Sequence, residues 1–269
     1  MNGVHATRCL FGILTREALR FLHQRERFIA ALVRPLLWLL IVGAGFRTAF
    51  GDAVVAPYET AVPYEVYIAP GLIVMIQLFN GMQSSLSMVY DREMGSMRTL
   101  LVSPLPRWYL LTCKLMAGTL VSLIQVYAFL IVARLAGIDL PLMGFLLVLP
   151  ALIVNGLMLG AFGMLLSSVI RQLENFAGIM NFVIFPVFFL SPALYPLSRL
   201  RDSSEILYTL CTLNPFTYAV DLVRFALYDR LDLPAAGVTL LSLALFLALA
   251  VYAYDPARGM MGRRRVAEA

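Results

Sequence analysis

Charged side chains are scarce in this chain of 269 residues. They make up 14% of it, against about 25% in an average soluble domain, while apolar residues make up 61%. Disordered chains are rich in charge and poor in apolar residues, so the composition excludes disorder. A soluble globule of this size would have to expose much of its apolar surface, so a lone water-soluble domain is excluded as well.

Residue types that build catalytic and metal sites are also rare. The only lysine, Lys114, lies between Cys113 and Leu115, so the chain lacks the Gly-Lys-Ser/Thr sequence of a phosphate-binding P-loop. Two histidines, His5 and His23, are too few for a typical histidine metal site, and the three cysteines form no CxxC pair. We therefore expect no metal site, no bound cofactor and no enzymatic activity in this chain.

Long apolar stretches are abundant instead. A helix needs about 20 apolar residues to cross the hydrocarbon core of a bilayer. Six stretches meet this requirement, at about 29–46, 66–89, 109–135, 142–170, 176–194 and 237–254. The sequence therefore predicts an all-α polytopic membrane protein with six transmembrane helices.

The first 28 residues are too densely charged for a signal peptide. At 100° per residue, one face is apolar, with Leu10, Phe11, Leu14, Ala18, Phe21 and Leu22. The opposite face carries Arg16, Arg20, His23 and Arg27. This pattern favours an amphipathic helix in the headgroup region over an ordinary charged tail. We expect an interfacial segment at 1–28, a membrane domain at 29–254 and a basic cytoplasmic tail at 255–269.

The distribution of basic residues predicts the orientation. An even number of spans puts both termini on one side of the membrane. If that side is the cytoplasm, the inner segments hold 14 arginine and lysine residues and the outer ones hold 5, with Arg34 and Arg134 left uncounted near span ends. Cytoplasmic loops carry an excess of Arg and Lys, so both termini are predicted to be cytoplasmic.

Neutral polar residues interrupt several of the predicted spans. Gln77, Asn80, Ser84 and Ser87 recur at i, i+3, i+7 and i+10 and form one stripe, and single asparagines occur at Asn155 and Asn181. Such residues either hydrogen-bond neighbouring helices or line a path for a polar or amphipathic substrate, and both interpretations stay open for the stripe. Carboxylates avoid the predicted hydrocarbon core, which argues against an ion-coupled carrier.

The segment from Tyr90 to Trp108 is long for a turn between two spans. Met94, Met97, Leu100 and Leu101 recur at helical spacing among charged neighbours, and Pro104 and Pro106 follow. This pattern predicts a short cytoplasmic helix that fits the groove of a soluble partner. The alternative is an interfacial helix without a partner.

Two segments of the chain carry distinctive motifs. The first has an acidic residue and a glycine after the second span, a short helix, the sequence Ser-Pro-Leu-Pro-Arg at 103–107, and Lys114. The second is Asn-Pro-Phe-Thr-Tyr-Ala-Val-Asp-Leu-Val-Arg at 214–224, ahead of the last span. Both segments resemble the type-2 family of ATP-binding-cassette (ABC) export permeases, and the resemblance extends over nearly the whole chain.

This resemblance implies a membrane permease subunit in the bacterial cytoplasmic (inner) membrane. Two permease chains, identical ones by expectation, would form the pathway, and two separate ATPase subunits would bind ATP and Mg. The implied coupling helix for the ATPase comprises Asp91, Arg92, Glu93, Gly95, Met97, Arg98 and Leu101. The cargo would be a polysaccharide, a lipid-linked molecule or an amphipathic small molecule, with membrane lipid and no nucleic acid as further partner.

The resemblance also implies a re-entrant helical hairpin within 191–236, before the last span. Its signature residues would be Asn214, Pro215, Tyr218, Asp221 and Arg224. Asp221 and Arg224 are three residues apart, so they can pair on one helix face and hold the hairpin. The alternative function is an ion-coupled secondary transporter that acts without an ATPase.

Overall fold

The computed structural model describes residues 3–23, 25–43, 45, 56–58, 62–93, 106–170 and 173–253, and these are almost entirely helical. In chain order the helices are α1 (Gly3–His23), α2 (Arg25–Leu37), the π-helix η1 (Trp38–Val42), α4 (Tyr64–Glu93), α6 (Arg107–Leu135), α7 (Leu142–Leu147), α8 (Leu149–Val169), α9 (Leu173–Phe189), α10 (Leu197–Ser203), α11 (Glu205–Leu213), α12 (Pro215–Leu227) and α13 (Leu233–Ala253). The predicted all-α class is confirmed over these residues.

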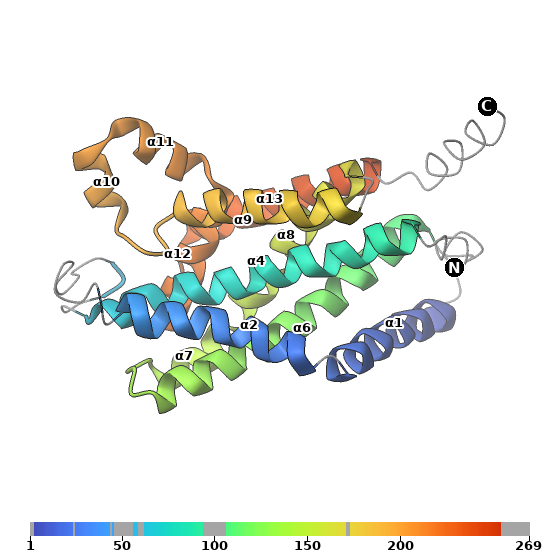
Figure 1. The fold of residues 1–269 in the computed structure, drawn as a ribbon, viewed down its shortest axis with the longest axis horizontal. Coiled ribbons are helices and arrows are strands. Elements are labelled where there is room, and N and C mark those ends of the chain that lie inside the picture. Colours follow the sequence, from blue (N-terminus) through green and yellow to red (C-terminus); the bar gives the residue numbers. More distant parts are fainter. Residues whose placement is uncertain are drawn as a thin grey trace.

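Helix α4 is the centre of the bundle. It packs against α8, α6, α9, α12, α2 and η1, and the long helices run roughly along one axis (Figure 1). Its apolar residues are buried on all sides, including Leu72, Ile73 and Leu78. A helix that is buried on all sides belongs in the interior, so the second predicted span forms the core and not the lipid-facing shell.

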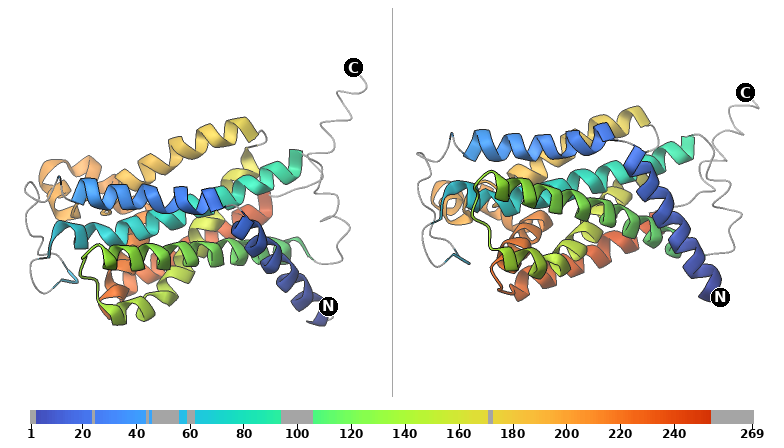
Figure 2. Two further views of the ribbon diagram at one scale, coloured as in Figure 1. Left: turned by 60° about the horizontal axis from the view of Figure 1, so that its bottom comes forward. Right: turned by 90° about the horizontal axis from the view of Figure 1, so that it is seen from below.

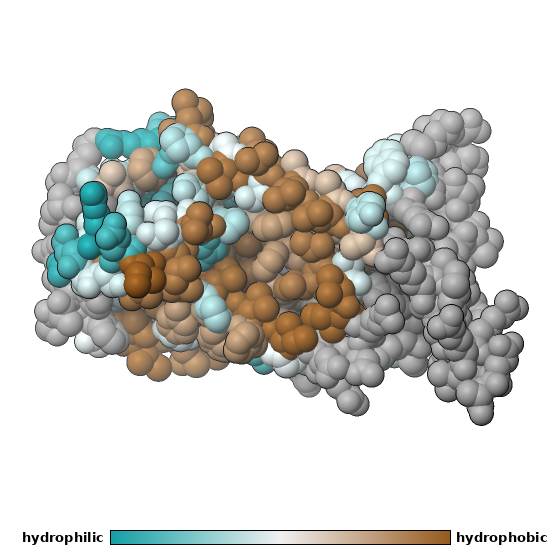
Figure 3. Space-filling view, turned by 90° about the horizontal axis from the view of Figure 1, so that it is seen from above, coloured by the Kyte–Doolittle hydropathy of each residue, from teal (hydrophilic) through white to brown (hydrophobic). Residues whose placement is uncertain are grey.

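Within the described residues, four helices are long and apolar enough to cross a membrane: Tyr64–Tyr90, Trp108–Leu135, Leu149–Val169 and Leu233–Ala253. Helices α11 and α12 would add a fifth span if counted together, but they are bent by 75° where they meet. Two shorter apolar helices cover Ala31–Val42 and Gly178–Phe189. Figure 3 shows apolar side chains over the middle of the described surface and hydrophilic ones at the end where α10 and α11 lie.

The fifth expected stretch, 176–194, is helical only as far as Phe189. A bend at Leu190 and Ser191 follows it, and then a turn at Pro192 and Ala193. Proline has no N–H to donate and disfavours a helical conformation in the residue before it, so the helix ends ahead of Pro192. The predicted apolar stretch extends to residue 194, so hydropathy alone did not show that the helix ends at Phe189.

Helix α1 confirms a helix at the N-terminal segment. It packs against α6 and, more lightly, against α2. Figure 2 shows it crossing obliquely at one end of the bundle, while α10 and α11 lie at the other end. The side chain of Phe11 is 67% exposed on this helix, as expected of a residue available to lipid.

Candidate functional site

The polar stripe of α4 faces two different neighbours. Gln77 is buried and its Nε2 donates to the carbonyl oxygen of Leu152 in α8 at 2.7 Å. Asn80 is half-buried; its Nδ2 donates to the oxygen of Ile76 at 3.0 Å and to Oε1 of Gln125 in α6. These bonds connect α4 to the helices on either side, which is the helix–helix role left open by the sequence.

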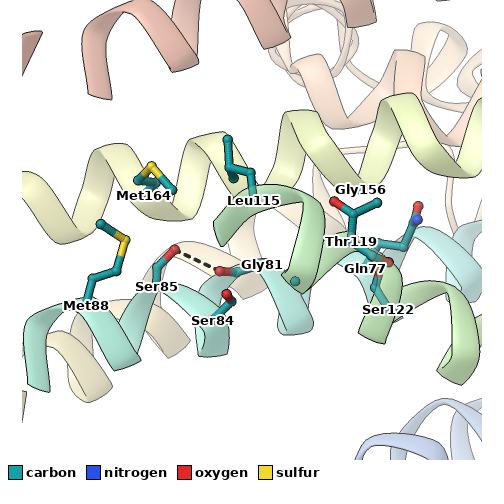
Figure 4. Close-up of a pocket in the computed structure, with 12 residues that line it drawn as sticks. Gln77, Gly81, Ser84, Ser85, Met88, Leu115, Thr119, Ser122, Gly156 and Met164 are labelled. Carbon is teal, nitrogen blue, oxygen red and sulfur yellow. Dashed lines mark hydrogen bonds between the residues drawn. The ribbon is translucent and has the colours of Figure 1, made fainter. Parts of the chain in front are cut away.

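A small cavity of about 10 Å³ lies between α4, α6 and α8 (Figure 4). Its lining includes Gln77, Ser84, Thr119, Ser122 and Gly156. Oε1 of Gln77 and Oγ1 of Thr119 are buried without a hydrogen-bond partner among the described residues. A space of this size takes about one water molecule and is too small for cargo.

Glycines let α4 and α8 touch backbone to backbone. A Cβ added to Gly81 would lie 2.8 Å from the oxygen of Leu159, and one added to Gly163 would lie 2.7 Å from the oxygen of Gly81. Real Cβ atoms do not approach backbone atoms this closely, so a side chain here would push the two helices apart. Small residues of this kind are the usual means of close helix packing in membranes.

We expect Gly81→Ala to lower the free energy of unfolding by about 1–3 kcal/mol, the usual cost of overpacking a tight core. Gly178 in α9 is the matched control, because an added Cβ there meets nothing within 4 Å. Gly178→Ala should be neutral or slightly stabilising through helix propensity. Thermal unfolding of the two variants in the same detergent checks this; equal melting temperatures would contradict the close approach of α4 and α8.

The two single asparagines do not share a site. Asn155 is fully buried in α8, and its Nδ2 donates to the oxygen of Ala219 in α12 at 2.8 Å. Asn181 lies exposed on α9. Asn155, like Gln77, therefore lies inside the chain, whereas Asn181 is on its surface. Ser87 lies in α4, and its side chain is outside the described residues.

A buried arginine organises the end of the bundle that holds α12. Arg224 is 2% exposed; its Nη1 donates to Oδ1 of Asp221 at 2.7 Å and its Nη2 donates to the oxygen of Pro192 at 2.6 Å. The guanidinium carbon also lies 4.5 Å from the ring centroid of Tyr67 in α4. Arg224 thus joins α12, α4 and the turn after α9, with a charge partner and an aromatic face to offset its burial.

The other signature residues hold α12 to the chain before it. Oδ1 of Asn214 accepts from the backbone N–H of Phe216 at 3.0 Å, as an N-cap does, and Pro215 occupies the first helical position. Nδ2 of Asn214 donates to the oxygens of Val187 and Leu190, both at 2.7 Å. The hydroxyl of Tyr218 donates to the oxygen of Thr212 at 2.9 Å. One asparagine therefore fixes both the start of α12 and the end of α9.

Several tyrosines belong to this cluster and were missed by the sequence reasoning. The hydroxyls of Tyr67 and Tyr64 donate to the oxygens of Pro192 at 3.1 Å and of Leu194 at 2.8 Å. Tyr58 and Tyr228 pack edge to face, with ring centroids 5.0 Å apart. Burial raises the pKa of Tyr228 to about 12 and also raises that of Tyr58.

The predicted coupling residues fall at the end of α4 and beyond it. Asp91, Arg92 and Glu93 form the last turn of α4 and continue the span as helix. Gly95, Met97, Arg98 and Leu101 lie outside the described residues. The role of this segment stays a prediction.

Helices of spanning length packed around a buried apolar helix define an integral membrane protein. The chain matches the ABC-2 type transporter family over residues 8–228. It belongs to this family and is the membrane subunit of an ABC transporter. Membership implies that it works with an ABC ATPase.

Named relatives agree with this assignment. A protein of Cyanophora paradoxa named transport permease ycf38 is 28% identical over 224 residues, which are 80% of this chain and 73% of that protein. The protein of the same name from Porphyra purpurea is 28% identical over 224 residues, or 82% of this chain and 74% of that protein. A protein of Escherichia coli K12 named multidrug ABC transporter permease YbhR is 30% identical over 170 residues, or 62% of this chain and 45% of that protein.

Proposed function

We propose that this chain is the transmembrane half of an ABC exporter in a bacterial inner membrane. Two identical copies form the pathway, and two ATPase subunits bind ATP and Mg and drive it. The observation that carries this proposal is the family match across residues 8–228, which includes the predicted coupling segment and the hairpin signature. The family match does not favour the alternative of an ion-coupled carrier.

The proposed membrane domain, 29–254, has six spans. They are α2 with η1, then α4, α6, α7 with α8, α9, and α13. Helices α10 to α12 then form the re-entrant hairpin. The 75° bend between α11 and α12, and the Arg224 contacts that hold α12 inside the bundle, support a hairpin and not a straight span.

The cytoplasmic side is assigned to the end of the bundle that holds α1. Figure 1 shows the C-terminal end of α4 at that same end. Segment 91–101 would therefore emerge beside the arginine-bearing α1, on the side favoured by the positive-inside rule. There it docks on the ATPase, while 1–28 lies along the headgroups and 255–269 forms the basic tail.

The cargo is proposed to be a polysaccharide, a lipid-linked molecule or an amphipathic small molecule. The word multidrug in the name of the Escherichia coli relative supports the last of these. Since the cavity among α4, α6 and α8 is too small for cargo, we place the path between the two proposed copies of the chain.

Co-expression with the ABC ATPase encoded nearest to this chain tests the proposal. We expect a complex of two permease and two ATPase subunits in mild detergent, resolved by native mass spectrometry. If no ATPase co-purified with this chain in any of several mild detergents, that result would contradict the proposed function.

A further inference from the structure

A charged side chain lies deep in the proposed first span. The guanidinium carbon of Arg34 in α2 is 4.1 Å from the ring centroid of Phe79 in α4. Phe79 is buried and lies near the middle of α4, next to Asn80. The charge pattern of the sequence placed Arg34 near a span end, whereas its packing places it beside the middle of the longest helix.

An arginine at this depth is costly and usually has a function. Among the residues that the structure describes, no carboxylate pairs with Arg34, and its contact is the face of an aromatic ring. A cation over a ring offsets only part of the lost hydration. Arg34 is exposed on the single chain, so its donors are available to another molecule.

A cavity of about 40 Å³ opens beside this arginine, between α2 and α4. Arg34, Asn80 and Gln83 supply its polar lining, and Met75, Ile76, Phe79, Ala31 and Pro35 supply its apolar lining. The amide of Gln83 is half-buried and makes no hydrogen bond within the described part of the chain. The Arg34 guanidinium, the Gln83 amide and several apolar side chains thus lie together at one place on the surface of the bundle.

We propose that Arg34 and Gln83 bind the acidic head group, a phosphate or a carboxylate, of an amphiphilic cargo. The planar guanidinium donates two parallel hydrogen bonds to such a group, and the Gln83 amide can donate a further one. The apolar walls suit the first carbons of the attached chain. This inference rests on the proposed function and narrows its cargo from three classes to acidic amphiphiles.

A tryptophan placed next to the site provides a direct readout of binding. Trp38 follows Arg34 by one helical turn and packs on Phe188 and Phe189, with ring centroids 6.0 and 5.9 Å away. The chain has two tryptophans, so Trp108→Phe leaves Trp38 as the sole reporter. The purified chain in a non-ionic detergent is then titrated with phosphatidic acid, with phosphatidylcholine as the control lipid.

We expect phosphatidic acid to change Trp38 fluorescence saturably, and phosphatidylcholine to have little effect. Arg34→Gln should weaken the apparent affinity by about tenfold or more, since it removes a charge-assisted pair of hydrogen bonds. Gln83→Leu should weaken it less, and Arg34→Lys should lie between Arg34→Gln and the parent. Arg134→Gln is the matched control, because Arg134 pairs with Asp139 elsewhere on the surface and should leave binding unchanged.

Equal affinity for the two lipids, or equal affinity of the Arg34→Gln variant and the parent at unchanged melting temperature, would overturn the site. A Gln83→Leu variant that folds and binds like the parent would remove Gln83 from it. This titration uses the chain alone, so its result is independent of whether the ATPase assembles, which tests the proposed function separately.

Cargo and resident lipid are distinguished by trapping the complex with ADP and vanadate. A cargo site should release phosphatidic acid on trapping, because the pathway has switched, and the Trp38 signal should return to its lipid-free value. Retention of the lipid with unchanged affinity would overturn the cargo assignment.

Discussion

Replacing Arg224 with alanine is expected to destabilise the protein by about 3–5 kcal/mol, the usual loss when one partner of a buried ion pair is removed. The change leaves the carboxylate of Asp221 without its Arg224 donor, leaves the carbonyl of Pro192 with the Tyr67 hydroxyl in place of two donors, and removes the cation from the face of Tyr67. Arg224→Lys should retain the charge but lose the forked donation to two acceptors, so we expect an intermediate loss. The measurement is thermal unfolding in detergent, together with the yield of folded protein.

The matched control is Arg134→Ala. Arg134 also pairs with an aspartate, Asp139, but both side chains are substantially exposed, at 41% and 91%. Exposed pairs contribute about 0–1 kcal/mol, so this variant should melt near the parent. If Arg224→Ala and Arg134→Ala melted alike, the buried cluster would not hold α12 to α4 and to the turn after α9.

Glu93→Arg and Gly95→Pro should each abolish the coupling between ATP hydrolysis and the membrane domain, with membrane insertion retained. Glu93 is the last residue of α4, and Gly95 follows in the segment proposed to dock on the ATPase. Charge reversal changes the sign of the charge at the start of the proposed docking segment, and proline removes a backbone N–H donor and fixes the φ angle. We expect at least a tenfold loss of ATPase co-purification or of lipid-stimulated hydrolysis, as for the loss of one buried charge contact.

Glu17→Arg is the control for charge reversal. Glu17 lies in α1, at the same end of the bundle but outside the docking segment. The Glu17→Arg variant should leave co-purification of the ATPase unchanged. Parental coupling in both Glu93→Arg and Gly95→Pro would remove the docking role from 91–101.

The apolar pattern of the sequence predicted most helices, because burial and lipid exposure both require long apolar runs. Each of the six expected stretches contains a helix, and α4, α6 and α13 agree closely with their predicted ranges. Apolar composition does not report helix ends, so the break at Val148 between α7 and α8 and the stop at Phe189 were missed. Both depend on local backbone geometry, and proline alone does not mark it, since Pro35, Pro70 and Pro186 lie inside helices.

Some contacts of the candidate site could be predicted from the sequence, and others could not. The spacing of Asp221 and Arg224 on one helix face was enough to indicate their pair, which forms in the structure. The contacts of Tyr67 with Arg224, and of Arg34 with Phe79, join helices far apart in the chain. No periodicity within a helix encodes such pairings, since they depend on how the helices pack.

The most direct test asks whether a separate ATPase moves this membrane domain. A spin label at Ser198→Cys, exposed on α10 at the end proposed to face outward, with Cys9 replaced by serine, gives one distance between two copies. Cys113 and Cys211 are buried and should not react. We expect trapping with ADP and vanadate to shift this distance only when the ATPase subunits are bound. The same shift in the chain alone, or ATP hydrolysis by the chain alone, would contradict a permease driven by a separate motor.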